Sequence, residues 1–206
     1  HYLNNHMEGV IVDGTLGDGG HTEFILKNTG PKIKVLGIDR DQFAIERAEK
    51  RLHRFGDRIR LAHGSFENLQ SLVIQSGITK INGLLLDFGV SSSQLDTPSR
   101  GFSIRNDGPL DMRMDNSQIT TAAILLEKLK DEELISILKN FGEERFAKKV
   151  VGAIRREQKK GPITRTSLLS KVVSEVIKPK RNSRIHPATK TFQALRIAVN
   201  NELEQI

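Results

Sequence analysis

Two acidic residues and a run of glycines near the start of the chain have the types and spacing of a nucleotide-like cofactor site. Asp13 follows the apolar run Val10–Val12 and precedes a turn containing four glycines, of which the last is Gly20. Asp39 ends a second apolar run, 19 residues after Gly20. Glycines let the backbone approach a ligand, and an acid at the end of the second strand can accept hydrogen bonds from two ribose hydroxyls. The spacing predicts a cofactor site at the carboxyl edge of a parallel sheet.

The charge of this turn separates two classes of cofactor. A dinucleotide site presents backbone amides to an anionic pyrophosphate, which a carboxylate at Asp13 would repel. The third glycine of the dinucleotide pattern is also missing, because Thr22 stands in its place. S-adenosylmethionine carries no phosphate and has a cationic sulfonium and ammonium. The turn therefore favours S-adenosylmethionine, and an NAD-dependent dehydrogenase remains the alternative.

Two further strand ends carry residues of interest. Phe66 follows the predicted strand Ile59–His63 and offers an apolar wall for an adenine, although a core phenylalanine after a turn fits equally well. Asp87 follows the run Leu84–Leu86, which reads as a strand buried on both faces. In a methyltransferase sheet that strand end borders the methyl group and its acceptor. The local sequence at Asp87 does not indicate which atom of the acceptor is methylated.

The elements that must position these residues alternate along the first part of the chain. Short apolar runs typical of buried strands are separated by stretches with helical periodicity, which predicts an α/β fold with a doubly wound parallel sheet. After Phe88 comes a long loop rich in Ser, Gly, Pro and Asp, and from Thr121 every predicted element is helical. The final helix, predicted from Thr191, is expected to return to the sheet. We therefore expect a core of residues 1–109 and 188–206, with residues 110–187 as a helical insertion.

Composition limits the classes of protein that fit. Charged residues make up 28% of the 206 residues and hydrophobic residues 37%, as in ordinary globular proteins. No apolar run approaches the 18 residues of a membrane span, and no secretory leader is indicated. The absence of cysteine excludes disulfides and thiol catalysis and is compatible with a reducing cytoplasm. We expect a cytoplasmic protein without a membrane partner.

Positive charge is concentrated in one part of the chain. Residues 139–196 contain 16 of the 32 lysines and arginines but only 4 of the 25 acids. Such a segment is typical of proteins that bind a polyanion, although solvated basic helix faces are the common alternative. The residues expected to neutralise phosphates of a nucleic acid are basic side chains of this segment, namely Lys148, Lys149, Arg155, Arg156, Arg165 and Lys190.

The string Asp107–Asp115 is unusual, with three acids and an arginine in a turn-rich loop. Such a loop can act as an active-site lid, or its arginine can simply pair with its own acids. Its spacing is not that of a calcium-binding loop, so no metal site is expected.

Taken together, these segments resemble the bacterial ribosomal small-subunit RNA cytosine-N4-methyltransferase family, known as the MraW family. The resemblance covers nearly the whole chain in the same order. Asp107–Asp115 and His186–Glu202 are highly specific to that family. The other matching segments are Asp13–His21, Leu85–Ser92, Gln94–Asp96, Arg100–Ser103, Gly142–Ala147 and Pro162–Thr166.

The resemblance implies a class I methyltransferase fold with an inserted helical RNA-recognition domain and S-adenosyl-L-methionine as cofactor. The implied acceptor is the exocyclic N4 of a decoding-region cytidine in small-subunit ribosomal RNA, presented as RNA or as a ribosomal particle. Asp87 and Asp111 are the candidates for accepting the N4 proton. The implied cofactor residues are Gly19, Gly20, His21, Asp39, Phe66, Asp87 and Gln94.

The resemblance leaves some points open. The family continues beyond the last helix with segments that complete its sheet, whereas this sequence stops at Ile206. The core is therefore expected to lack its C-terminal strands. A non-catalytic RNA-binding module is the alternative to an enzyme, and the pattern does not decide between a monomer and a homodimer.

Overall fold

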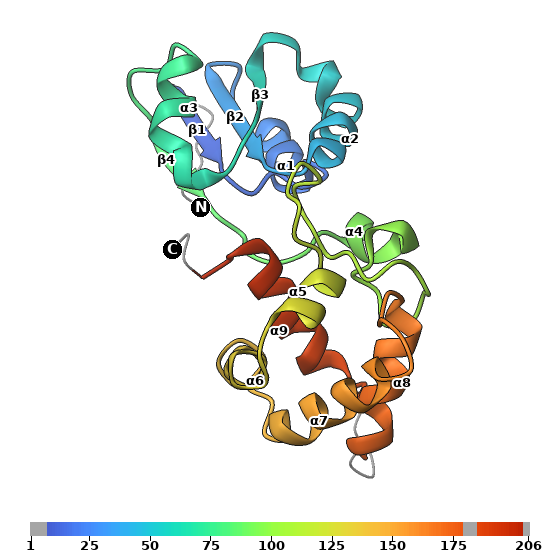
Figure 1. The fold of residues 1–206 in the computed structure, drawn as a ribbon. Helices are drawn as coiled ribbons and strands as arrows, with labels where there is room; N and C mark the ends of the chain where they lie inside the picture. Colours follow the sequence, from blue (N-terminus) through green and yellow to red (C-terminus); the bar gives the residue numbers. More distant parts are fainter. Residues whose placement is uncertain (1–7, 179–184, 204–206) are drawn as a thin grey trace. The chain divides into compact units, whose positions relative to one another are not determined.

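Residues 8–91 form a four-stranded parallel sheet with helices on both faces, in a computed structural model that describes residues 8–178 and 185–203 (Figure 1). The chain divides into two units, residues 1–91 and residues 92–204. The strand order in the first unit is β3-β2-β1-β4, which confirms the predicted α/β fold. Its elements are β1 Gly9–Asp13, α1 Gly20–Asn28, β2 Ile33–Asp39, α2 Gln42–Leu52, η1 His53–Arg58, β3 Ile59–His63, η2 Phe66–Asn68, α3 Leu69–Gln75 and β4 Gly83–Leu85.

Alternating side chains of the strands build an apolar core on each face of the sheet. Ile11 of β1 and Val35 of β2 point to the face covered by α1. Their neighbours Val12 and Leu36 point to the other face, where side chains of α3 cover them. In Figure 1, α1 and α2 accordingly lie on one side of the sheet and α3 on the other. Burial on both faces explains why β1 and β2 read as continuous apolar runs.

The strand register brings the predicted acids to one edge of the sheet. Asp13 pairs with Gly37 of β2 and with Leu85 of β4. Asp39 lies two residues further along β2, and Asp87 lies two residues beyond the end of β4. All strands are parallel, so these three acids follow or end neighbouring strands at the carboxyl edge.

The expectation that Leu84–Leu86 is buried on both faces is wrong for the described residues. β4 pairs only with β1 and is an edge strand of the sheet. The Leu84 side chain is 45% exposed and that of Leu86 is 38% exposed. An apolar run shows that a segment is hydrophobic, but it does not tell whether a second strand lies beside it.

The second unit is helical in its described part, residues 92–178 and 185–203. Helices α7 and α8 pack together, and α6 contacts both α7 and α9. No helix in the two described ranges is long and apolar enough to cross a membrane. The elements are α4 Ser92–Asp96, η3 Pro98–Arg100, α5 Ala122–Lys128, α6 Asp131–Asn140, α7 Ala147–Gln158, α8 Thr166–Val176 and α9 Thr189–Asn200.

The boundary between the units differs from the expected division at residue 110. Helix α4 and the loop that follows it already belong to the second unit, which begins at Ser92. Helix α9 belongs to the second unit, where it packs against α5 and α6. Its amphipathic sequence requires an apolar partner, but such a pattern does not distinguish a sheet from other helices. Residues 179–184 of the expected helical insertion lie outside the described residues.

The Asp107–Asp115 string is fixed within the second unit. The Gly108 amide donates to the Thr166 hydroxyl at 3.0 Å, and the Arg165 guanidinium pairs with Asp107. At the other end, Asn200 of α9 accepts a hydrogen bond from the Met114 amide and donates one to a neighbouring carbonyl. These contacts favour the internally paired loop over a mobile lid.

Candidate functional site

The glycine-rich turn between β1 and α1 requires glycine at two positions. Gly17 and Gly19 have φ values of 52° and 77°, in the left-handed region that side chains disfavour. A Cβ on Gly19 would also lie 2.9 Å from the Leu52 side chain of α2. The turn is fixed to the sheet because the Leu16 amide donates to the Ile38 carbonyl at 3.0 Å. The predicted ligand-approach turn is therefore a rigid, close-packed feature.

Asp13 is fully buried directly beneath this turn. Its carboxylate accepts a hydrogen bond of 2.7 Å from the Thr22 hydroxyl and one of 3.3 Å from the Thr15 amide. Burial raises the pKa of the Asp13 carboxyl, and the bond from Thr22 opposes this shift. Thr22 therefore stabilises the buried Asp13 carboxylate. From the sequence alone, Thr22 was noted only as the residue that replaces the third glycine of the dinucleotide pattern. A hydroxyl residue nine positions after an acid that ends a strand is the signal that could have identified this pair.

Asp39 is oriented by two backbone amides at the end of β2. One carboxylate oxygen accepts a hydrogen bond of 2.7 Å from Gly17, and the other accepts one of 2.8 Å from Asp41. Burial raises the pKa of the Asp39 carboxyl, and the two amides act in the opposite direction. Each oxygen of an ionised carboxylate has a second lone pair. Asp39 can therefore accept two more hydrogen bonds while it remains attached to the turn.

Asp87 presents an exposed carboxylate at the same edge. Its backbone amide donates to the Thr15 hydroxyl at 2.6 Å, which joins the end of β4 to the turn after β1. Its side chain is 67% exposed, and an Asp87 oxygen lies 3.8 Å from Nδ1 of His21 in the first turn of α1. The structure thus brings together two predicted site residues from separate strand–helix units.

Aromatic rings border the same edge. The Phe66 and Phe88 rings meet edge to face, with centroids 5.3 Å apart. Phe88 is 47% exposed, and Phe66 is half-buried near Gly14. Phe88 was not singled out from the sequence as a site residue, because only the fold places it beside Phe66.

Two of the predicted site residues belong to the second unit. Gln94 is a buried side chain of α4. Asp111 forms a two-pronged ion pair with Arg113, with N–O distances of 2.7 and 2.8 Å. This contact raises the pKa of the Arg113 guanidinium. Both oxygens of Asp111 are therefore already engaged with a cation.

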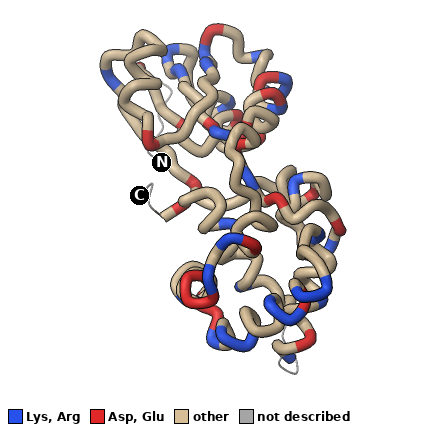
Figure 2. Tube along the Cα trace, viewed as in Figure 1, with Lys and Arg blue, Asp and Glu red and all other residues tan. Residues whose placement is uncertain are grey.

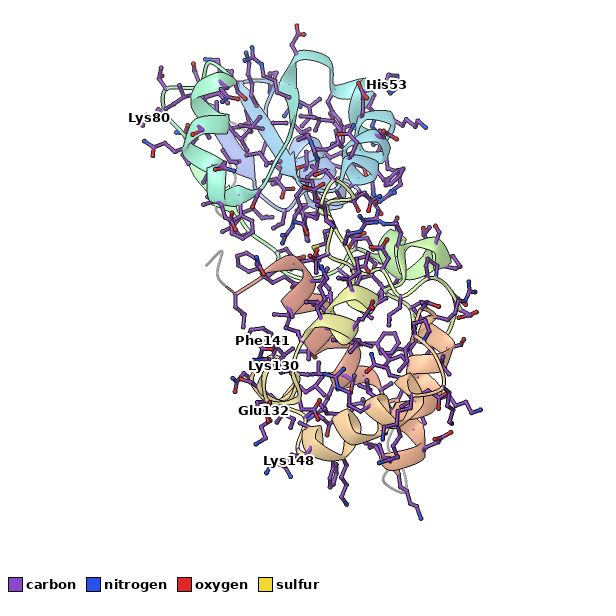
Figure 3. The ribbon with its side chains drawn as sticks, in the orientation of Figure 1. His53, Lys80, Lys130, Glu132, Phe141 and Lys148 are labelled. Atoms are coloured by element: carbon purple, nitrogen blue, oxygen red, sulfur yellow. The ribbon has the colours of Figure 1, made fainter. Side chains whose placement is uncertain are left out.

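The basic residues predicted to contact RNA fall into two groups. Arg155, Arg165 and Lys190 bind partners inside the protein, including Asp131, Asp107 and the Glu143 carbonyl. A second group lies exposed on α7, where Figure 2 shows basic positions along the helix and Figure 3 shows Lys148 pointing outward. The exposed group consists of Lys148, Lys149 and Arg156.

The sequence is similar to known proteins along nearly its whole length. Residues 1–206 match the sequence profile of the MraW methylase family. The chain is 54% identical over 200 residues to a protein of Trichlorobacter lovleyi named ribosomal RNA small subunit methyltransferase H. Proteins with the same name from Sorangium cellulosum and Geobacter sulfurreducens are 48% and 47% identical. The matches cover 96%, 99% and 98% of this chain but 64%, 64% and 65% of the three relatives. The chain thus spans less than two thirds of their length.

Proposed function

Because the chain belongs to the MraW methylase family, we propose that it methylates a cytidine in the decoding region of small-subunit ribosomal RNA. The methyl donor is S-adenosyl-L-methionine, and the acceptor is the exocyclic N4 of the base. The relatives' name supports a small-subunit ribosomal RNA as the substrate. Such a substrate places the reaction in the cytoplasm.

The acidic carboxyl edge of the sheet is the observation that carries this proposal. Asp13, Asp39 and Asp87 lie at neighbouring strand ends, and the glycine turn runs between them. An anionic pyrophosphate would meet unfavourable charge there, whereas a cationic sulfonium and ammonium would be stabilised. The edge therefore supports S-adenosyl-L-methionine rather than NAD.

The residues present fit that cofactor. Asp39 has two lone pairs left for the ribose hydroxyls, and Gly17, Gly19 and Gly20 let the backbone come close to the ligand. Phe66 with Phe88 provides an apolar wall against which an adenine can stack. S-adenosyl-L-methionine supplies an electrophilic methyl group when bound.

The protein must make the acceptor nitrogen more nucleophilic. The N4 lone pair is delocalised into the cytosine ring, so a group that accepts an N4 hydrogen makes the nitrogen more nucleophilic. Asp87 has an exposed carboxylate for this role, whereas both oxygens of Asp111 are paired with Arg113. We therefore assign proton acceptance to an Asp87 carboxylate oxygen. Asp111 serves to fix the loop of the second unit.

The second unit supplies RNA affinity in this proposal. The exposed cations of α7 neutralise phosphates, which makes binding salt-dependent. The target base must leave its stack to reach a methyl donor, and positioning of that base supplies much of the rate.

Calorimetry with the two rival cofactors tests the proposal. The protein is expected to bind S-adenosyl-L-methionine in the micromolar range and to show no heat of binding with NAD. Tight binding of NAD would overturn the methyltransferase assignment in favour of a dehydrogenase. A protein that binds RNA but binds neither of the two cofactors would favour a non-catalytic RNA-binding module.

A further inference from the structure

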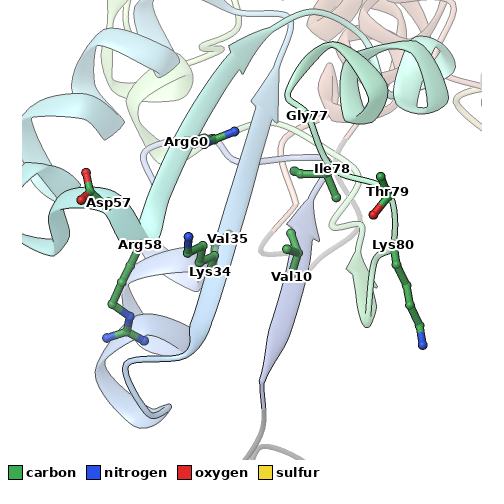
Figure 4. A pocket seen from close by; sticks show the side chains of 10 residues that line it. All are labelled: Val10, Lys34, Val35, Asp57, Arg58, Arg60, Gly77, Ile78, Thr79 and Lys80. Carbon is green, nitrogen blue, oxygen red and sulfur yellow. The ribbon is translucent and has the colours of Figure 1, made fainter.

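A second feature of the first unit is a pocket on the opposite edge of the sheet from the acidic site. It has a volume of about 230 Å³ and lies where strands β1, β2 and β3 begin. Figure 4 shows the side chains that line it, which come from these strand starts and from the segment between α3 and β4. They are Val10, Lys34, Val35, Asp57, Arg58, Arg60, Gly77, Ile78, Thr79 and Lys80.

The pocket is built on rigid structure. Val10, Val35 and Ile78 supply its apolar part, and Val35 is only 2% exposed. The Arg58 guanidinium donates to the carbonyls of Leu26, Ile33 and Gly30 at 3.0 Å each. These hydrogen bonds hold the guanidinium against the backbone, so that it forms a fixed wall of the pocket.

The remaining cations of the pocket are available to a ligand. Lys34, Arg60 and Lys80 are exposed, and Arg60 donates one hydrogen bond to the Ser76 carbonyl. Within the described residues, neither Lys34 nor Lys80 has a carboxylate within 4.0 Å. Two other lysines of the same unit are paired, Lys27 with Glu23 at 2.9 Å and Lys32 with Glu8 at 3.0 Å. The pocket therefore carries four cations against the single carboxylate of Asp57.

This charge stands out because the unit as a whole is neutral. Residues 8–91 contain eleven lysines and arginines and eleven acids. The carboxyl edge of the sheet is acidic, with Asp13, Asp39 and Asp87, and would repel a phosphate. A phosphodiester that approaches this unit is accordingly favoured at the opposite edge, where the unpaired ammonium groups lie.

We propose that this pocket, at the amino-terminal ends of β1–β3, binds two backbone phosphates of the RNA substrate, one through Lys34 and one through Lys80. The inference rests on the proposed function, because RNA is the polyanion that the enzyme must engage. The pocket gives the methyltransferase unit an RNA contact of its own, in addition to the basic helix α7.

The test compares the salt dependence of RNA binding in two double variants of the protein. Binding of a small-subunit RNA fragment is measured by fluorescence anisotropy between 50 and 200 mM salt, without cofactor. The Lys34→Gln/Lys80→Gln variant is expected to reduce the slope of log K against log salt by about 2, because each lost phosphate contact removes about one unit. The control Lys27→Gln/Lys32→Gln makes the same change of charge at two paired lysines and is expected to leave the slope nearly unchanged.

Equal slopes for the two double variants would overturn the proposal. A titration with inorganic phosphate, followed by NMR, separates a small-anion site from an RNA contact. Shifts at the pocket with phosphate, combined with an unchanged RNA slope, would likewise contradict RNA binding there. Failure of the proposed function would appear as an absence of methyl transfer by the wild-type protein. The salt slope of RNA binding is measured without cofactor, so its result does not depend on methyl transfer.

Discussion

Replacement of Asp87 by asparagine is expected to lower kcat by about 100- to 10,000-fold, the usual contribution of a positioned proton acceptor. The asparagine keeps the size of the side chain and the backbone bond from residue 87 to Thr15, but it cannot take up the N4 proton. Single-turnover methyl transfer at saturating RNA measures the chemical step. Calorimetry with S-adenosyl-L-methionine on the same variant is expected to give an affinity within about tenfold of the wild type.

Asp111→Asn is the matched control for this prediction. The substitution weakens the ion pair with Arg113 and is expected to lower the free energy of unfolding, while kcat stays within about threefold of the wild type. Urea unfolding and the same transfer assay measure both effects. A variant at Asp87 with normal kcat, or a folded Asp111 variant without activity, would reverse the assignment of the proton acceptor.

The second large effect is expected for Asp39→Ala, which should weaken binding of S-adenosyl-L-methionine by about 100-fold or more. The estimate corresponds to two hydrogen bonds from ribose hydroxyls to an ionised acceptor, each of about 1.5–3 kcal/mol. Removal of the carboxylate also leaves the Gly17 amide without its acceptor, which loosens the turn. Isothermal titration calorimetry measures the change directly.

The affinity should also depend on pH in a defined direction. Burial raises the pKa of the Asp39 carboxyl, and only the ionised form can accept from both hydroxyls. Affinity is therefore expected to fall as the pH is lowered through this raised pKa, and the fall should disappear in Asp39→Ala. The control Asp57→Ala removes one exposed carboxylate from the opposite edge and should leave the affinity unchanged. An Asp39 variant that binds the cofactor normally would contradict the ribose role.

The sequence was most informative where local pattern and chemistry coincide. Strand β3 has the predicted ends, and β1 begins one residue before the apolar run Val10–Val12. Burial on both faces makes such strands continuously apolar, and parallel strands align their carboxyl ends. Asp13, Asp39 and Asp87 could therefore be placed at one edge from spacing alone.

The features that were missed depend on contacts between distant residues. The pairing of Thr22 with Asp13 and the packing of α9 on α6 involve side chains that no periodic pattern connects. The same is true of Arg155, which appeared as an RNA-binding cation but binds Asp131 and nearby carbonyls. A charge count gives the number of cations, whereas only the fold shows which of them are already paired.

Transfer of a labelled methyl group from S-adenosyl-L-methionine to small-subunit particles tests the proposed chemistry most directly. The modified nucleotide is then located by nuclease digestion and mass spectrometry. We predict label on the N4 nitrogen of a single cytidine in the decoding region. Label on another atom or nucleotide, or no transfer by a folded protein that binds both cofactor and RNA, would contradict it.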